Sequence, residues 1–236
     1  MIRLSKVTSG FGHLTILRDI DLVLDVGEMV LVLGANGAGK TTLLRTISGL
    51  AQVRSGSITF DGQDITGAQP HRLARSGLVH VPQGRQIVPH LTVEENLLIG
   101  AQHVPGITAR LMTERLEAEY ARFPVLKERR HVPGGSLSGG EQQMLAVSRG
   151  LMMGPRVLML DEPSLGLAPQ AIHRILVAVE ALARQGMSVL MVEQKTSALR
   201  FAQRALVLRN GEIVFSGQAK GLSADDELMR HYGGAG

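Results

Sequence analysis

The chain contains no cysteine and few aromatic residues, and each shortage limits what the protein can be. Without cysteine it cannot form a disulfide, a thiolate metal site or a cysteine nucleophile, and this composition fits the cytosol. Aromatic residues make up 3% of the 236 residues, so the core has to be aliphatic. A chain of this length can form one large domain or a domain with a subdomain.

Long hydrophobic runs and a leader pattern are also missing. No apolar run approaches the ~20 residues that a membrane-spanning helix needs. The start, Met1 to Lys6, goes directly into a strand-like alternation, which does not resemble a signal peptide. The net charge is +4 with both signs mixed along the chain, which is typical of a mildly basic solvated surface. No nucleic-acid partner is therefore expected.

Hydrophobic patterns predict an α/β chain that starts with an antiparallel β layer. Residues 2–7 and 15–26 show the period-two alternation of half-buried strands. Met29 to Leu33 is a continuous apolar run, which suits a strand buried on both faces. The next predicted elements are a helix over 41–48 and strands over 57–60 and 78–81.

Helical spacing replaces this alternation between about residues 89 and 153. Helices are predicted over 93–101, 109–123 and 140–153. We therefore expect a single domain over 1–236. It would consist of an α/β core, at about 1–88 and 154–236, and a helical subdomain inserted at about 89–153.

The α/β pattern resumes after the predicted insert. The expected elements are a strand over 157–160, a helix over 170–184, a strand over 187–192 and a helix over 196–203. Asn210-Gly211 lies between two apolar segments and predicts a tight hairpin. A short helix is predicted from Ser223.

The segment Gly34-x4-Gly39-Lys40-Thr41 has the spacing of a phosphate-binding loop. Glycines allow backbone N–H groups to converge on phosphate oxygens, and Lys40 would supply positive charge to the β- and γ-phosphates. The Thr41 hydroxyl can ligate Mg²⁺, and the dipole of the following helix favours an anion. An ordinary turn is the alternative, but the buried strand before the loop and the helix after it favour the phosphate site.

Two carboxylates, Asp161 and Glu162, follow the aliphatic strand predicted at 157–160. Side chains at the carboxyl end of a buried parallel strand face the ligand crevice of such a sheet. Asp161 can hold Mg²⁺ through water, and Glu162 can act as the general base that polarises an attacking water. The alternative is a solvated acidic turn before Pro163.

Gln83 ends the strand predicted at 78–81, where the chain leaves the core for the helical insert. Its amide could ligate Mg²⁺, orient water or report the nucleotide state to the insert. Taken alone, a surface glutamine is the simpler interpretation.

Residues Leu137 to Gln142, with the sequence LSGGEQ, form a polar turn before a predicted helix. Ser138, two glycines and a helix N-terminus make a second anion site. Because the chain already has a phosphate loop, this second site is explained if another subunit brings the nucleotide. Ser138 followed by Glu141 also fits an ordinary capped helix start, and both interpretations can hold together.

In order and spacing, the phosphate loop, Gln83, the LSGGEQ turn and Asp161-Glu162 resemble the motifs of ATP-binding-cassette (ABC) ATPase subunits. Together they span nearly the whole chain. The phrases at 81–85, 91–97, 162–169 and 192–194 resemble the second ATPase subunit of bacterial branched-chain amino-acid importers. Urea and short-amide importer ATPases are neighbours of that group.

The resemblance implies a P-loop NTPase core and a set of ligand-binding residues. ATP and Mg²⁺ are the implied cofactors, and an aromatic ring at Phe11 would stack on adenine. Ser138 and Gly140 would contact the γ-phosphate of ATP held by the partner subunit. The implied ATP ligands within the chain are Asn36, Gly37, Gly39, Lys40, Thr41 and Thr42. The implied magnesium ligands are Thr41, Gln83 and Asp161, and the implied catalytic residues are Glu162, Gln83 and Gln194.

The resemblance also implies partners and a location. Two ATPase subunits, identical or different, would clamp two ATP molecules between them. They would drive two transmembrane permease subunits, whose substrate comes from a periplasmic binding protein. The chain would then be a peripheral subunit on the cytoplasmic face of the inner membrane.

Two positions depart from the general ABC pattern. Gln194 replaces the usual switch histidine, and Leu167 stands where many ABC proteins have aspartate. An amide carries no charge, so our hypothesis is that this subunit's own site hydrolyses ATP more slowly than its partner's site. Two further functions remain open: a non-transport ABC ATPase linked to DNA or translation, and a soluble ATPase scaffold in cofactor assembly.

Overall fold

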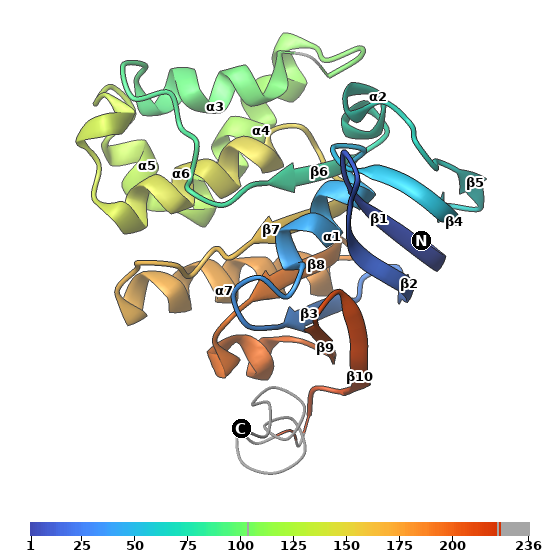
Figure 1. The fold of residues 1–236 in the computed structure, drawn as a ribbon. Helices are drawn as coiled ribbons and strands as arrows, with labels where there is room; N and C mark the ends of the chain where they lie inside the picture. Colours follow the sequence, from blue (N-terminus) through green and yellow to red (C-terminus); the bar gives the residue numbers. More distant parts are fainter. Residues whose placement is uncertain (103, 221, 223–236) are drawn as a thin grey trace.

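The computed structural model describes residues 1–102, 104–220 and 222, and its strands form two sheets (Figure 1). The first sheet is antiparallel and has the strand order β2-β1-β4-β5. Its strands are β1 (Ile2–Phe11), β2 (Leu14–Leu24), β4 (Gln52–Phe60) and β5 (Gln63–Asp64). The predicted antiparallel layer is therefore present.

The second sheet has six strands in the order β10-β9-β3-β8-β7-β6. All neighbouring pairs are parallel except β9 and β10, which form a hairpin around Asn210-Gly211. The strands are β3 (Met29–Leu33), β6 (Leu78–Val81), β7 (Val157–Asp161), β8 (Ser188–Glu193), β9 (Arg204–Arg209) and β10 (Glu212–Gln218). This arrangement confirms the predicted α/β class with a mostly parallel sheet.

The strand register brings distant parts of the sequence to one edge of this sheet. Leu33 at the end of β3 pairs with Glu193 at the end of β8. Asp161 at the end of β7 pairs with Val192, and Val81 at the end of β6 lies opposite Leu160. The loops that follow β3, β6, β7 and β8 therefore leave the sheet side by side, which is where α/β sheets bind ligands.

Side chains of the parallel strands alternate between two hydrophobic clusters. Val30 and Val32 pack with the antiparallel sheet and with α1 (Lys40–Ile47), which lies between the two sheets (Figure 1). Leu31 and Leu33 point to the opposite face, which is covered by α6 (Gly139–Leu151) and α7 (Pro169–Arg184). Burial on both faces explains why these strands appear in the sequence as continuous aliphatic runs.

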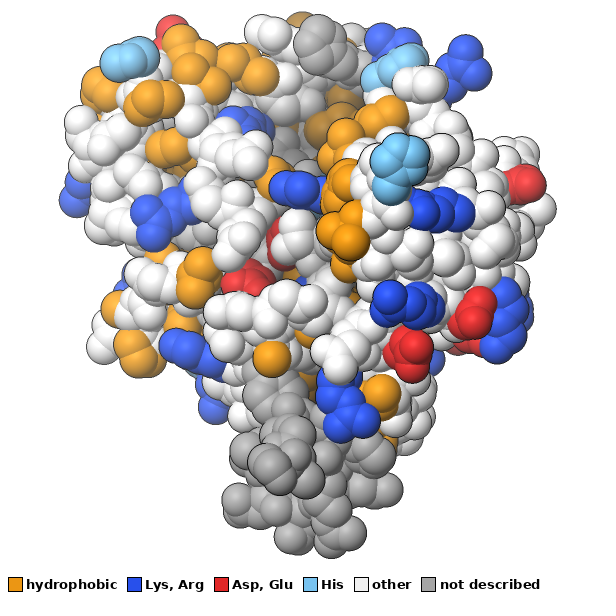
Figure 2. Space-filling model, in the orientation of Figure 1, with side chains coloured by type: hydrophobic (Ala, Val, Ile, Leu, Met, Phe, Trp, Pro, Cys, Tyr) orange, Lys and Arg blue, Asp and Glu red, His pale blue; other side chains and the backbone are white. Residues whose placement is uncertain are grey.

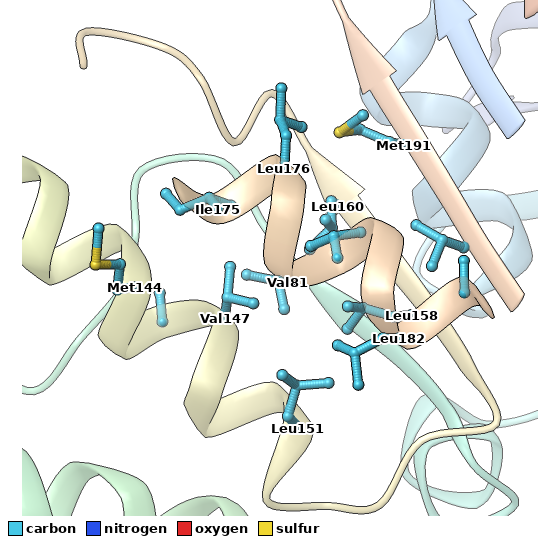
Figure 3. Packing of buried hydrophobic residues seen from close by; sticks show 14 of the residues in the cluster. Val81, Met144, Val147, Leu151, Leu158, Leu160, Ile175, Leu176, Leu182 and Met191 are labelled. Atoms are coloured by element: carbon cyan, nitrogen blue, oxygen red, sulfur yellow. The ribbon is translucent and has the colours of Figure 1, made fainter. Parts of the chain in front are cut away.

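The packing of α6 and α7 on the sheet is aliphatic (Figure 3). Val147 of α6 lies close to Val81, and Leu151 of α6 lies near Leu182 of α7. Gly150 has a steric reason to be glycine, because an added Cβ would lie 2.8 Å from the Val81 side chain. The helix that follows the LSGGEQ turn is thus packed directly on β6.

The region between β6 and β7 is helical, as the spacing predicted. Its elements are α3 (Val93–Ala101), α4 (Ala109–Arg122), α5 (Pro124–Glu128), the short 3₁₀ helix η1 (Gly134–Ser136) and α6. Side chains from these helices and from the parallel sheet belong to one continuous hydrophobic cluster. The division into a core and a subdomain at residues 89 and 153 stays a prediction.

Several elements differ from the predictions. The segment predicted as a helix over 196–203 forms a 3₁₀ helix, η2 (Thr196–Phe201). β4 begins at Gln52 instead of residue 57, because its first half is largely exposed and carries no hydrophobic alternation. The helix α2 (Pro70–Arg75) was missed because six residues are too few to show a helical period. The helix predicted from Ser223 falls outside the described residues.

His80 on β6 is expected to make the fold sensitive to acid. Its Nδ1 lies 3.3 Å from the Ser48 hydroxyl, and its Nε2 is buried without a hydrogen-bond partner among the described residues. Burial lowers the pKa of His80 to about 4, and the positive charge of Arg45 contributes. In the unfolded chain the pKa is about 6.5, so below that pH the unfolded state binds more protons. The free energy of unfolding should fall by about 3 kcal/mol between pH 7 and pH 4 through this residue alone.

Urea denaturation at pH 7, 5.5 and 4 measures this effect. Carboxylates also titrate in this range, so the matched variant His80→Gln supplies the reference, since it stays neutral at every pH. We expect the stability difference between the two proteins to change with pH. If the free energy of unfolding of both proteins changed equally with pH, His80 would not be the acid-sensitive group.

Candidate functional site

The phosphate loop forms one wall of a cavity of about 300 Å³ at the carboxyl edge of the parallel sheet. The cavity also receives Gln83 from the end of β6 and Glu162 from the end of β7. Its lining residues are Ile16, Asn36, Gly37, Gly39, Lys40, Thr41, Thr42, Gln83 and Glu162. The structure therefore brings together eight of the residues named from the sequence and adds Ile16, which no sequence pattern indicated.

Two glycines explain how the loop follows its path. Gly39 precedes α1 with φ 107°, a left-handed conformation that residues with a side chain rarely adopt. At Gly34 the constraint is space, because an added Cβ would lie 2.6 Å from the Leu208 carbonyl oxygen. The spacing of the motif thus reflects both the turn and the close approach of β9.

Lys40 is almost fully buried and makes three polar contacts. Its Nζ donates to the carbonyl oxygens of Gly34 and Ala35 at 2.8 and 3.0 Å. It also lies 3.0 Å from Glu162 Oε1. The ammonium group is therefore held at the mouth of the loop, where it is available to an anionic ligand.

Both carboxylate oxygens of Glu162 are held by hydrogen-bond donors. Lys40 approaches Oε1, and the Gln83 side-chain amide donates to Oε2 at 3.1 Å. Gln83 is therefore more than an isolated surface glutamine, because it links the end of β6 to the end of β7. A phosphate that attracted Lys40 would free one oxygen of Glu162 to accept a proton from water.

Asp161 lies deeper than Glu162 and is 2% exposed. Its Oδ1 accepts a hydrogen bond from the Thr41 hydroxyl at 3.1 Å. Its Oδ2 is buried and has no hydrogen-bond partner among the described residues. Burial raises the pKa of Asp161, the Thr41 bond opposes this, and the negative charge of Glu162 adds to it.

This environment fits a magnesium ion. An unpaired buried carboxylate oxygen is costly, and a cation or a cation-bound water would satisfy it. The Thr41 hydroxyl and the Gln83 amide are the other oxygen ligands that the sequence suggested. The donor set is all oxygen, which is the chemistry that Mg²⁺ prefers.

Phe11 lies outside the lining of this cavity. It ends β1, at the tip of the hairpin with β2, and its ring is 38% exposed. The Arg45 guanidinium lies over the ring at 6.0 Å from its centre. A role in stacking on adenine stays a prediction, and the ring is accessible for it.

The LSGGEQ turn caps the start of α6. Ser138 and Glu141 form a reciprocal capping box, in which Glu141 accepts from the Ser138 backbone N–H at 2.7 Å. Gly140 packs so closely that an added Cβ would lie 2.7 Å from the Ala171 side chain. No residue of the turn is among the described residues that line the phosphate-loop cavity. Gln142, at the end of the turn, lines a neighbouring cavity of about 320 Å³ together with Glu162.

One face of the molecule is hollowed (Figure 2). In the orientation of Figure 1, the hollow lies between the helical region and the antiparallel sheet, with acidic and basic side chains at its centre. Beside the cavity, the Arg85 guanidinium donates to the Gln142 side chain at 3.0 Å. This bond connects the loop after Gln83 to the LSGGEQ turn, a contact that sequence reasoning did not anticipate.

Gln194 follows β8 and is exposed, so the structure places it at the same edge of the sheet. The residue before it, Glu193, is 2% exposed and was missed as a site residue. One signal could have found it: like Asp161, it is an acidic residue at the end of an aliphatic strand.

The arrangement of a phosphate loop, two carboxylates and a separate LSGGEQ turn agrees with the sequence comparisons. Residues 17–165, more than half of the chain, match the family model described as ABC transporter. The chain belongs to the ABC transporter family. It is an ABC ATPase, and nucleotide binding follows from that membership.

Two similar proteins cover nearly the whole length of this ABC ATPase. The high-affinity branched-chain amino acid transport ATP-binding protein BraG of Pseudomonas aeruginosa is 41% identical, over 98% of this chain and 99% of its own. The probable branched-chain amino acid transport ATP-binding protein LivF of Archaeoglobus fulgidus is 36% identical, over 98% of this chain and 95% of its own.

A solved structure has the same fold as this ABC ATPase. It is a nucleotide-free ATP-binding cassette from an ABC transporter, with a TM-score of 0.83 and 28% identity over 92% of this chain and 91% of that one. Among the residues that the structure describes, no helix has the length and hydrophobicity needed to cross a membrane.

Proposed function

We propose that this ABC ATPase is the ATP-hydrolysing motor of an importer for branched-chain amino acids, bound to permease subunits at the cytoplasmic face of the membrane. The observation that carries the proposal is the pair of contacts at the phosphate-loop cavity: Lys40 lies 3.0 Å from Glu162, and the Thr41 hydroxyl donates to the buried Asp161 at 3.1 Å. Two similar proteins over nearly the whole chain carry branched-chain amino acid transport in their names, which supports the substrate class.

Within the cavity, the phosphate loop would bind the triphosphate of ATP. Backbone N–H groups from Asn36 to Thr42 and the start of α1 would surround the β-phosphate, as the conformation of the loop allows. Lys40 would turn from Glu162 to the γ-phosphate. Thr41, Gln83 and Asp161 would hold Mg²⁺, with Asp161 acting through water. The ion would neutralise charge on the β- and γ-phosphates when bound.

Glu162 would then accept the proton of the attacking water. Its carboxylate lies at the mouth of the cavity, and Gln83 keeps one oxygen in place while Lys40 leaves the other. Positioning of the water and electrostatic stabilisation of the phosphoryl group account for most of the catalysis in this class of reaction.

A second subunit completes the proposed assembly. Ser138 and Gly140 would contact the γ-phosphate of ATP bound by a partner ATPase, since neither of them is among the described residues that line the phosphate-loop cavity of their own chain. The equivalent turn of the partner would contact the γ-phosphate of the ATP bound to this chain. Closure of this dimer around two nucleotides would supply the movement that two permease subunits use.

Co-purification from detergent-solubilised membranes tests the transport assignment. We expect the tagged chain to retain a second ATPase subunit and two polytopic membrane proteins. Recovery with nucleic acid or with soluble partners alone would contradict transport. It would favour the alternatives, a DNA- or translation-linked ATPase or a soluble assembly scaffold.

Uptake by the reconstituted complex then tests the substrate. Vesicles containing the complex and its periplasmic binding protein should accumulate labelled leucine in an ATP-dependent manner. Uptake of urea or a short amide in place of leucine would support the neighbouring importer class and reject the amino-acid assignment.

Gln194→His is expected to raise ATP turnover at this site roughly fivefold, because a charge-assisted hydrogen bond to the γ-phosphate replaces a neutral one. The measurement is steady-state phosphate release by the dimer, with the partner's own site inactivated so that only this site is counted. Gln194→Asn, which is also a neutral amide, is the matched control and should give no increase. An unchanged or lower rate for Gln194→His would contradict the idea that Gln194 makes this the slower site.

A further inference from the structure

A buried carboxylate outside the proposed catalytic set holds the loop that carries Glu162. Glu193, the last residue of β8, is 2% exposed, and Ser164 is 5% exposed. Glu193 Oε1 accepts from the Ser164 backbone N–H at 2.9 Å, and Oε2 accepts from the Ser164 hydroxyl at 2.8 Å. Each oxygen of this carboxylate thus accepts a hydrogen bond from Ser164. We call this pair the Glu193–Ser164 clamp.

Ser164 lies two residues beyond Glu162, and the clamp is the second of two contacts that attach the Glu162 loop to β8. The Glu162 backbone N–H donates to the Val192 carbonyl oxygen at 3.0 Å. The segment from Glu162 to Ser164 is therefore bound at both ends to the last two residues of β8. With the backbone fixed in this way, the Cα–Cβ bond of Glu162 has a fixed direction.

The backbone of Glu162 needs this support. Its φ is 45°, in the left-handed region that residues other than glycine, asparagine and aspartate rarely occupy. Such a conformation persists when surrounding contacts hold it, and it is common where a side chain has to be aimed. Pro163, which follows, allows no hydrogen bond from its own nitrogen, so the next donor along the chain is the Ser164 N–H.

We propose that Glu193 is a positioning residue for ATP hydrolysis, which holds Glu162 at the attacking water through the Glu193–Ser164 clamp. The inference rests on the proposed role of Glu162 as general base. Glu193 itself does not line the phosphate-loop cavity, so it acts through the loop and not on the nucleotide. Gln194 is its neighbour in the chain, so the same anchor places both residues at the edge of the site.

Two substitutions at Glu193 separate the geometry of the clamp from its charge. Glu193→Ala removes both acceptors. Glu193→Gln keeps both contacts without charge, since its amide oxygen can accept from the Ser164 N–H and its NH₂ can donate to the Ser164 hydroxyl. We expect Glu193→Ala to lower kcat by roughly 10- to 100-fold with the KM for ATP unchanged. Glu193→Gln should stay within about threefold of the unaltered protein.

Ser164→Ala tests the other side of the clamp and carries the test if Glu193→Ala does not fold. It keeps the backbone N–H and loses the hydroxyl, so kcat should fall by less, roughly 3- to 10-fold. The double variant should be no slower than Glu193→Ala, because both changes break the same contact. All variants are measured in the full chain, with the ATPase partner present if turnover requires it.

The outcomes distinguish this inference from the function on which it rests. If Glu162→Gln retains full turnover, the proposed function is wrong and there is no base to position. If Glu162→Gln is inactive while Glu193→Ala or Ser164→Ala leaves kcat unchanged, the clamp alone is rejected. A Glu193→Ala variant with a raised KM for ATP and an unchanged kcat would also overturn the proposed role of the clamp. So would a Glu193→Gln variant as slow as Glu193→Ala.

Discussion

Replacing Lys40 with alanine is expected to abolish ATP turnover, with a loss of at least a hundredfold. The reason is that Lys40 is the cation that the phosphate loop directs at its ligand, through bonds to the carbonyl oxygens of Gly34 and Ala35. Removing a single group that stabilises transition-state charge typically costs 10²- to 10³-fold. Phosphate release and ATP-dependent uptake should fall together, and retained uptake would refute the role given to Lys40.

The fold is expected to survive the Lys40→Ala change with a measurable loss of stability. The change leaves Glu162 without its cation, although the Gln83 amide still donates to the carboxylate. Breaking a buried pair from one side costs up to about 3–5 kcal/mol, and water entering the cavity will reduce this. Adding Glu162→Gln should restore the stability but not the activity. The exposed Lys127, paired with Glu117, gives the control Lys127→Ala, which should change neither.

Glu162→Gln is expected to bind ATP but not to hydrolyse it, with turnover lowered by about 10²- to 10⁴-fold. The amide has the shape of the carboxylate and can still contact Gln83, but it cannot accept the proton of the attacking water. It also removes the anion that holds Lys40 when no nucleotide is bound, so Lys40 becomes available to the γ-phosphate. ATP should therefore accumulate in the site.

The same variant should stabilise the proposed dimer. Size-exclusion chromatography of Glu162→Gln with Mg-ATP, together with the partner subunit where this is needed, should show a larger species. Glu162→Gln/Lys40→Ala is the control, because it should no longer bind the triphosphate tightly and should elute at the smaller size. A single small species in every condition would contradict the model in which two subunits enclose two nucleotides.

The fold class and most elements could be predicted because the chain's local patterns are strong. The strand Met29–Leu33 and the helix Val93–Ala101 occur with the predicted bounds. Both begin at sharp signals: an apolar run after a glycine turn, and a Thr92 capping box. The first half of β4 offered no such signal, because most of its side chains are exposed and show no hydrophobic alternation.

The candidate site was predictable to the extent that its residues follow individual strands. Residues at the ends of β3, β6 and β7 could be named because each ends an aliphatic run. The contacts between these residues could not be predicted, because they depend on strand order and register. Gln83 donates to Glu162, Lys40 pairs with the Glu162 carboxylate, and Glu193 binds Ser164. The roles of these residues in catalysis remain predictions until the variants are measured.

The single hydrophobic cluster that joins the helical region to the parallel sheet has a consequence for how the molecule unfolds. Residues 89–153 look like a separate unit along the chain, but α6 and the sheet exclude water from each other's surfaces. Removing either partner would expose an aliphatic face that has no substitute cover. We therefore expect the two regions to unfold as one cooperative unit, so that a lesion in the packing of one lowers the melting temperature of both.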